Sequence, residues 1–182
     1  MALLAEVLVE EWLNRQGYFT MRGSKIGNSE IDLLAVSFRE TDALHVEVSV
    51  STNARSWTCP WTKRLRNELG YDKGPDKPRT RQQMEECVEE WISGKYRDNN
   101  PGDGKVAERR EAFCPGREWR FMFVHGDIKY QQELTLISER GVELKDIREV
   151  LEELRDRKRT PFATSSEASD IAALMDIYCK AL

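Results

Sequence analysis

The sequence has 182 residues, of which 40% are hydrophobic, and this length predicts one domain over residues 1–182 with a single substantial core. Its formal net charge of −4 weighs against tight non-specific binding of nucleic acid by the whole chain, because such binding depends on clustered lysine and arginine. The four cysteines are scattered without a C-x-x-C pair or a neighbouring histidine, which disfavours a zinc site and favours reduced thiols.

The beginning of the chain argues against secretion. Glu6, Glu10 and Glu11 lie within the first dozen residues, where a signal peptide does not tolerate acidic side chains. No stretch approaches about 18 consecutive apolar residues, the length that a membrane-spanning helix requires. We therefore expect a cytoplasmic protein without a membrane partner.

Periodicity and turn residues define the first expected elements. Apolar residues at helical spacing predict a helix over residues 2–16, and Gly17 is a natural left-handed stop for it. A short strand over residues 18–21 follows. The stretch 23–28 is rich in glycine, serine and asparagine and predicts a turn.

Two acidic residues lie inside the next two apolar runs, which predict strands over residues 30–38 and 43–51. Asp32 lies in the first run and Glu47 in the second, and alternation places Glu47 and Ser49 on one face. If the strands pair as a hairpin, Asp32 and Glu47 stand side by side. A carboxylate in a buried strand is costly to desolvate without a partner, and Mg²⁺ is usually held by one or two carboxylates with waters and phosphate.

Residues 52–79 contain prolines and glycines without a long periodic segment, which predicts a loop. Basic residues outnumber acidic ones here, so the loop is a positive island in an acidic chain. Aromatic rings among basic side chains suit base stacking or cation–π contact, although the same rings could equally cap the core beneath a long loop. The predicted nucleic-acid contacts are Lys63, Arg64, Arg66, Trp57 and Trp61.

The second half of the chain alternates helices and strands. Residues 119–124 are apolar on both faces and predict a central strand, residues 141–144 a further strand, and residues 97–117 a loop. With core segments over about 1–51 and 80–157, this order predicts a mixed α/β domain with helices packed on the sheet. The expected helices cover residues 81–95, 130–140, 147–157 and 165–181.

The motifs "EIDLLAV" and "HVEVSV", preceded by a helix with an acidic residue and by Gly17-Tyr18, resemble the PD-(D/E)XK nuclease superfamily. The likeness is strongest to small resolvase-like and restriction-endonuclease-like members and covers roughly residues 1–52. It implies a restriction endonuclease-like mixed sheet, built as helix, three-strand meander, helix and strand and flanked by helices. It also implies that Glu6, Asp32 and Glu47 hold Mg²⁺ or Mn²⁺, so that a metal-bound water attacks a DNA phosphodiester.

The resemblance implies catalytic positions at Asp32, Glu47 and Ser49, and Ser49 stands where the family has a lysine. That lysine steadies charge developing at the phosphate, whereas serine is uncharged and can only orient a water. Losing such a group typically lowers the rate by about 10²–10⁴. Lys25 could replace the lysine only through a folded-back turn, whereas Lys63 on the basic loop could approach without that restriction.

Several assignments stay open at this point. Glu10 lies one turn from Glu6 and competes with it as the helical metal ligand. His45 and His125 each fit a ligand, a general base or a structural residue. Two functions fit the sequence: a divalent-metal-dependent nuclease, active or catalytically impaired, and a non-catalytic module that binds nucleic acid or protein on a degenerate nuclease fold. A homo-oligomer or a protein partner fits the second.

Overall fold

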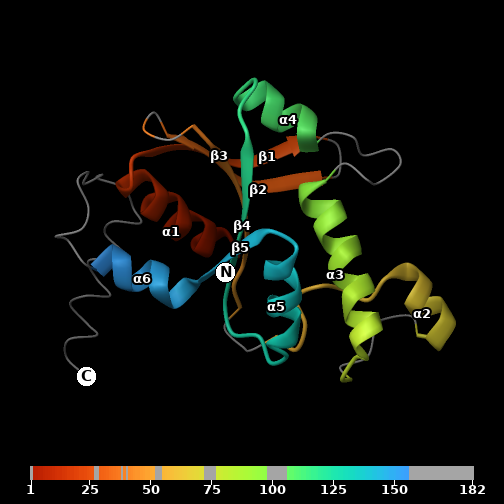
Figure 1. Ribbon diagram of the computed structural model, residues 1–182. Helices are drawn as coiled ribbons and strands as arrows, with labels where there is room; N and C mark the ends of the chain where they lie inside the picture. The colour runs from red at the N-terminus through yellow and green to blue at the C-terminus, as the bar shows by residue number, and fades with distance from the viewer. Residues whose placement is uncertain are drawn as a thin grey trace, which may run out of the picture.

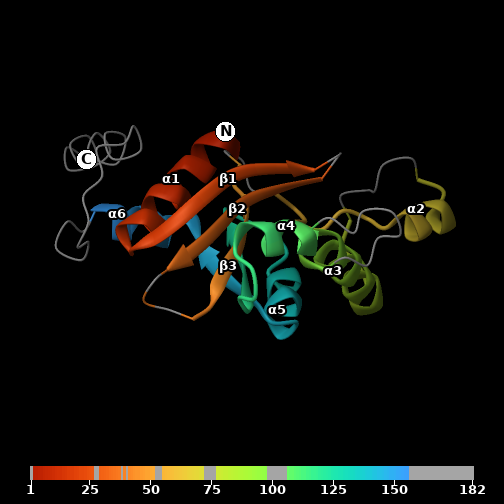
Figure 2. The same cartoon turned by 90° about the horizontal axis from the view of Figure 1, so that it is seen from above.

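The computed structural model describes residues 2–26, 29–37, 39, 41–51, 55–71, 77–97 and 106–155. It shows a five-stranded mixed sheet with helices on both faces, which confirms the predicted α/β class (Figures 1 and 2). The predicted helix over residues 165–181 lies outside the described residues. None of the helices in the described ranges is long and apolar enough to cross a membrane.

The strands follow one another across the sheet in chain order. The first three form an antiparallel meander, and the last three run parallel. The fourth strand has a partner on each side, as its apolar composition predicted. The strands are β1 (Tyr18–Ile26), β2 (Ser29–Ser37), β3 (Ala43–Ser49), β4 (Trp119–His125) and β5 (Val142–Asp146).

Side chains along β3 point alternately to the two faces of the sheet, and each face is covered by a layer of helices. Leu44, Val46 and Val48 join the core beneath α1 (Ala2–Arg15) and α6 (Ile147–Arg155), which cover one face of the sheet. The opposite face carries α3 (Arg81–Tyr96) and α5 (Gln132–Glu139), as Figure 1 shows. A second core cluster there includes Phe123, Val88, Ile92, Leu134 and Ile137.

The predicted turn over residues 23–28 is wrong for residues 23–26, because β1 continues to Ile26 and pairs with β2, while residues 27 and 28 lie outside the described residues. Gly23 is the residue that makes this possible, since its φ of 64° is a backbone conformation that other residues rarely adopt. The first part of the turn-forming segment is therefore strand, with a left-handed glycine inside it.

Two predicted loops contain short helices. Within residues 52–79 lies α2 (Lys63–Leu69). Thr62 caps its start, with a side chain that accepts from the Leu65 N–H, and Gly70 caps its end. Within residues 97–117, α4 (Val106–Phe113) packs against β2 and α3. Both helices are too brief to show a helical repeat, and tertiary contacts hold them in place.

Candidate functional site

The site begins where β2 and β3 separate. Their pairing runs from Val36 opposite Ala43 to Leu33 opposite Val46. One step further, the same register sets Asp32 opposite Glu47, on the face that carries α3. Asp32 Oδ2 accepts the Val48 N–H at 2.8 Å, so a carboxylate takes a place that a strand carbonyl would normally fill. The predicted placement of Asp32 and Glu47 on one face is confirmed.

The two carboxyls are held in an environment that disfavours their charge. Burial, and then the negative charge of Glu47, raises the pKa of Asp32 to about 7. Burial likewise raises the pKa of Glu47 to about 7, although Lys95 and hydrogen bonds involving Asp32 oppose this. Glu47 is 2% exposed. Two neighbouring acids of this kind are a typical sign of a functional site, because nothing in the packing of a strand requires them.

A lysine also lies beside the two acids: Lys95, in the last turn of α3. Its Nζ contacts Glu47 Oε2. Burial disfavours the charge of Lys95, but the Glu47 carboxylate and the charge of Asp32 outweigh it and raise the pKa of Lys95 above its usual value. An ammonium group thus stands beside both acids, supplied by a helix and not by the strand.

The two replacement lysines considered from the sequence lie elsewhere. Lys25 pairs with Glu30 at 3.4 Å on the exposed end of the β1–β2 hairpin. Lys63 is exposed at the start of α2, which both cartoon views place on the far side of α3 from the sheet (Figures 1 and 2). Lys95, which the sequence did not single out, is the lysine that contacts Glu47.

A signal for Lys95 was present in the predicted helix over residues 81–95. Its apolar stripe includes Val88, Trp91 and Ile92, and one more turn at the same spacing reaches Lys95. A lysine that continues the buried face of an amphipathic helix needs an acidic partner, because burying an unpaired charge is costly. The sequence shows this irregularity but not the identity of the partner.

Glu6, and not Glu10, is the acid of α1 whose pKa is affected by the charges of the site. Burial, and then the charges of Asp32 and Glu30, raise the pKa of Glu6. Glu10 instead accepts from the Thr20 hydroxyl at 3.2 Å and pairs with Arg22 at 3.3 Å. Across the described residues, no three histidine, cysteine, aspartate or glutamate side chains are grouped so that they could together hold a metal ion. Asp32 and Glu47 are the adjoining pair, with Glu6 as an outlying third carboxylate.

Ser49 has a partner of its own. Its hydroxyl accepts from Arg55 Nη1 at 2.8 Å, two residues along the strand from Glu47. The guanidinium brings a positive charge next to Ser49, but on an exposed side chain. A direct role of Ser49 in catalysis stays a prediction.

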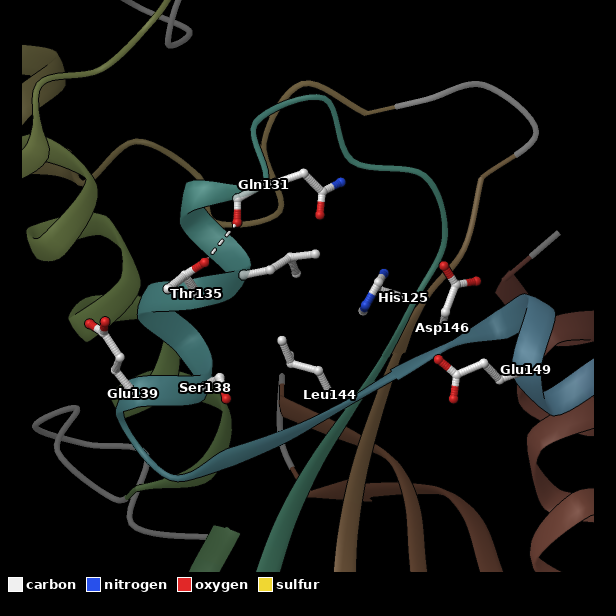
Figure 3. Close-up of a pocket in the computed structure, with 9 residues that line it drawn as sticks. His125, Gln131, Thr135, Ser138, Glu139, Leu144, Asp146 and Glu149 are labelled. Carbon is white, nitrogen blue, oxygen red and sulfur yellow. Dashed lines mark hydrogen bonds between the residues drawn. The ribbon is translucent and has the colours of Figure 1, made fainter.

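The two histidines differ in their surroundings. His45 is completely buried, with Nε2 3.2 Å from Glu47 Oε1, so it belongs to the carboxylate cluster. Burial, and then the charges of Arg110 and Lys95, lower the pKa of His45 well below its usual value. His125 lies at the end of β4 and faces a separate hollow of about 610 Å³ between α5 and the end of β5 (Figure 3).

The acids around that hollow have structural tasks. Asp146 accepts the Arg148 N–H at 2.8 Å at the start of α6, as a helix-capping residue does. Glu149, in the first turn of α6, pairs with Lys145 at 2.8 Å. The His125 Nδ1 atom lies 2.9 Å from the Gly126 carbonyl. These three polar lining residues thus each have a contact within the chain.

The two tryptophans of the basic stretch, Trp57 and Trp61, pack against the guanidinium of the buried Arg79. The Arg79 guanidinium lies 4.4 Å from the Trp57 ring centre and 4.6 Å from that of Trp61. Arg79 also pairs with the buried Glu133 at 3.4 Å. Trp57 further stacks on Tyr130, with ring centres 4.1 Å apart. The contacts match the core-capping alternative for these rings, and base stacking by them stays a prediction.

The basic side chains of α2 are in part already paired. Arg64 contacts both Glu68 and Glu86, whereas Lys63 is exposed and Arg66 is half-buried. Pairing with two glutamates reduces the positive charge that Arg64 offers to a phosphate. Lys63 is the member of the set best placed to meet nucleic acid, and that contact stays a prediction.

Comparison with known proteins adds little to this geometry. No family model and no curated protein matches the chain. A solved protein of unknown function, AF1548, is similar at 12% identity and a TM-score of 0.42 over 82% of this chain. The match spans 65% of that protein's length. A likeness this distant carries no argument about activity, so the function has to be argued from the site.

Proposed function

We propose that the chain is a divalent-metal-dependent phosphodiesterase of the PD-(D/E)XK type that acts on DNA, with Lys95 in the role of the missing motif lysine. The observation that carries this proposal is the contact of Lys95 Nζ with Glu47 beside Asp32. The three charged groups of the family's site, two acids and a lysine, are then present, with the lysine supplied by α3. The restriction endonuclease-like fold is part of the same proposal and rests on the meander, the two further strands parallel to β3 and the flanking helices.

The donor set suits Mg²⁺ or Mn²⁺. Both acids are oxygen donors, both have a raised pKa of about 7, and a cation between them would relieve their mutual repulsion. Mg²⁺ usually takes only one or two protein carboxylates and completes its shell with water and phosphate. Asp32 and Glu47 would hold it, with Glu6 near enough to contribute charge or a water contact. Such an ion supplies Lewis-acid polarisation of the phosphate and a more acidic bound water.

The chain's own residues then have distinct tasks. Lys95 places a fixed positive charge where negative charge develops on the phosphate during displacement, which is the largest single source of stabilisation in many enzymes. In the metal-free protein the ammonium is held by Glu47, and it would be released toward the phosphate once that carboxylate binds a cation. Asp32 is fixed by the Val48 N–H, which prevents its carboxylate from turning away.

The test is cleavage of plasmid and single-stranded DNA with Mn²⁺ by wild type and by Lys95→Ala. We expect Lys95→Ala to cut about 10²–10⁴ times more slowly, because it loses a positioned electrostatic group. Lys145→Ala is the matched control, since Lys145 also pairs with glutamates but lies against Trp12, across the sheet. Equal loss in both variants, or none in Lys95→Ala, would remove Lys95 from the mechanism.

A non-catalytic module is the second candidate, and one observation favours it. Lys95 neutralises Glu47, and no group of three metal-binding side chains occurs in the described part of the chain. A degenerate site of this kind would keep the ion pair for stability alone. Wild type would then fail to cut DNA at any Mn²⁺ concentration, and Ser49→Lys would not restore cleavage.

A further inference from the structure

We infer that His45 and Arg110 are positioning residues that fix the Glu47 carboxylate for metal binding. The inference rests on the proposed function, because it concerns the geometry of a proposed ligand. It adds two residues, from β3 and α4, that neither the motif nor its lysine includes. Figure 1 shows α4 packed at the end of the sheet where β4 begins.

The position of His45 is fixed by packing on all sides. It is 0% exposed, its ring centre lies 4.8 Å from that of Tyr96, and it meets Phe121 at 6.1 Å. Tyr96 is itself held by a hydrogen bond from its hydroxyl to the Met122 carbonyl at 2.8 Å. Between these rings, His45 points Nε2 at Glu47.

Arg110 decides which ring nitrogen carries the proton. Its Nη1 lies 3.2 Å from His45 Nδ1 and also donates to the Tyr96 carbonyl at 2.8 Å. A guanidinium can only donate, so Nδ1 must accept, and the neutral ring then carries its proton on Nε2. That proton is directed at Glu47 Oε1, 3.2 Å away.

The two oxygens of Glu47 therefore have separate environments. Oε1 is held by His45, and Oε2 contacts Lys95. Outer hydrogen bonds of this kind orient carboxylate ligands in metal sites, and removing one typically lowers metal affinity about 10–100-fold.

Packing alone does not explain a histidine at this position. Its register neighbours across the sheet are Leu34 and Phe121, so the surroundings are those of an apolar side chain. Burying an imidazole there is costly unless both of its nitrogens are paired. Arg110 contacts one ring nitrogen of His45 and Glu47 contacts the other, so both are paired and the chain of contacts ends on the proposed metal ligand Glu47.

Two variants of nearly equal size separate positioning from packing. The amide nitrogen of glutamine lies close to where His45 Nε2 lies, whereas that of asparagine lies close to Nδ1. His45→Gln therefore keeps the donor to Glu47, and His45→Asn loses it. We expect Mn²⁺ affinity of the full chain, measured by calorimetry, to fall about 10–100-fold in His45→Asn and only a few-fold in His45→Gln.

The stability of the variants and the tautomer of His45 are measured in separate experiments. Chemical denaturation of both variants shows whether they lose similar stability, and ¹⁵N NMR of wild type should show His45 protonated on Nε2. Arg110→Met keeps an unbranched stem but removes the donor to Nδ1 and should also lower Mn²⁺ affinity. If His45→Asn does not fold, Arg110→Met carries the test.

The outcomes separate this inference from the proposed function. Equal Mn²⁺ affinity in wild type, His45→Asn and Arg110→Met would overturn the positioning role while leaving metal binding intact. Equal losses in His45→Gln and His45→Asn would show that packing is the only role of His45. Wild type that binds no Mn²⁺ would overturn both proposals. The inference is supported if His45→Asn and Arg110→Met lose Mn²⁺ affinity while His45→Gln keeps most of it.

Discussion

Two buried glutamates show how the same residue type serves structure in one region and chemistry in another. Glu133 on α5 is completely buried, and Glu47 on β3 is 2% exposed. Glu133 accepts the backbone N–H groups of Thr58 and Cys59 and pairs with Arg79. Glu47 meets His45 and Lys95 and has a second carboxyl, Asp32, beside it.

The difference lies in what surrounds each charge. Burial raises the pKa of Glu133, but two backbone donors and Arg79 oppose the shift, so this carboxylate has a complete set of partners. It attaches the segment 55–62 to α5, which is a structural task. Glu47 instead shares its surroundings with another acid, Asp32, whose negative charge disfavours a second one beside it. Adjoining acids with raised pKa therefore point to function more strongly than burial does.

The largest expected effect is on stability, at Glu133. Glu133→Ala leaves the buried Arg79 unpaired and two N–H groups without an acceptor, so we expect a loss of about 3–5 kcal/mol in urea denaturation. Glu47→Gln is the contrasting variant. It removes a charge that burial disfavours at nearly constant shape, and Lys95, whose side chain is 39% exposed, can turn to solvent, whereas Arg79 cannot. We therefore expect a change in stability of less than about 1 kcal/mol. Similar losses in the two variants would erase the distinction between the two sites.

The pH dependence of stability tests the same distinction. The pKa of Asp32 and of Glu47 is about 7 in the folded protein, above the ordinary carboxyl value of about 4. The native state then binds more protons than the unfolded state between these values, so stability falls as pH rises from about 4 to 7. We expect this fall to be on the order of 1–3 kcal/mol larger in wild type than in Asp32→Asn with Glu47→Gln. Parallel pH profiles in metal-free buffer would contradict it.

Trp57→Ala probes the structural region with a smaller effect. The variant removes one of two rings that flank Arg79 and the stack on Tyr130. We expect a loss of about 1–2 kcal/mol in denaturation, because the guanidinium is desolvated and loses a cation–π contact. DNA cleavage by folded Trp57→Ala should stay at the wild-type rate. A large loss of DNA binding with unchanged stability would instead assign this ring to base stacking.

The smallest expected effect concerns the exposed basic residues of α2. Lys63→Ala should weaken DNA binding by less than about 1 kcal/mol and reduce the slope of log affinity against log salt by about 1, as for one phosphate contact. Arg64→Ala should do less, because Arg64 already pairs with Glu68 and Glu86. Fluorescence anisotropy at several salt concentrations measures both. A larger effect for Arg64→Ala than for Lys63→Ala would show that DNA displaces those glutamates.

Part of this site was accessible from the sequence because strand parity is a local property. The alternation in β3 fixes which side Glu47 faces, and the short connection to β2 makes antiparallel pairing with Asp32 the simplest arrangement. The apolar stripe of α3 predicted that helix equally well. Each of these inferences depends on residues a few positions apart.

The remainder depends on contacts between distant segments. Lys95 and Glu47 are brought together by the packing of α3 on the sheet, which periodicity in either segment does not specify. The helices α2 and α4 are short and are stabilised by tertiary packing of buried residues such as Leu65 and Val106. Because this packing leaves no helical periodicity in the local sequence, both segments were predicted as loops. The pairing of Arg79 with Glu133 is a tertiary contact of the same kind.

Crystals of the full chain soaked in Mn²⁺ and measured at the manganese absorption edge provide the most direct test of the carboxylate site. We expect one anomalous peak between the Asp32 and Glu47 carboxylates, with Lys95 Nζ moved away from Glu47 Oε2. Glu47→Gln crystals should lack the peak, whereas Glu133, with its partners complete, should bind no manganese in either. Wild-type crystals at saturating Mn²⁺ that show no peak beside Asp32 and retain the Lys95–Glu47 ion pair would contradict the assignment of these acids to metal binding.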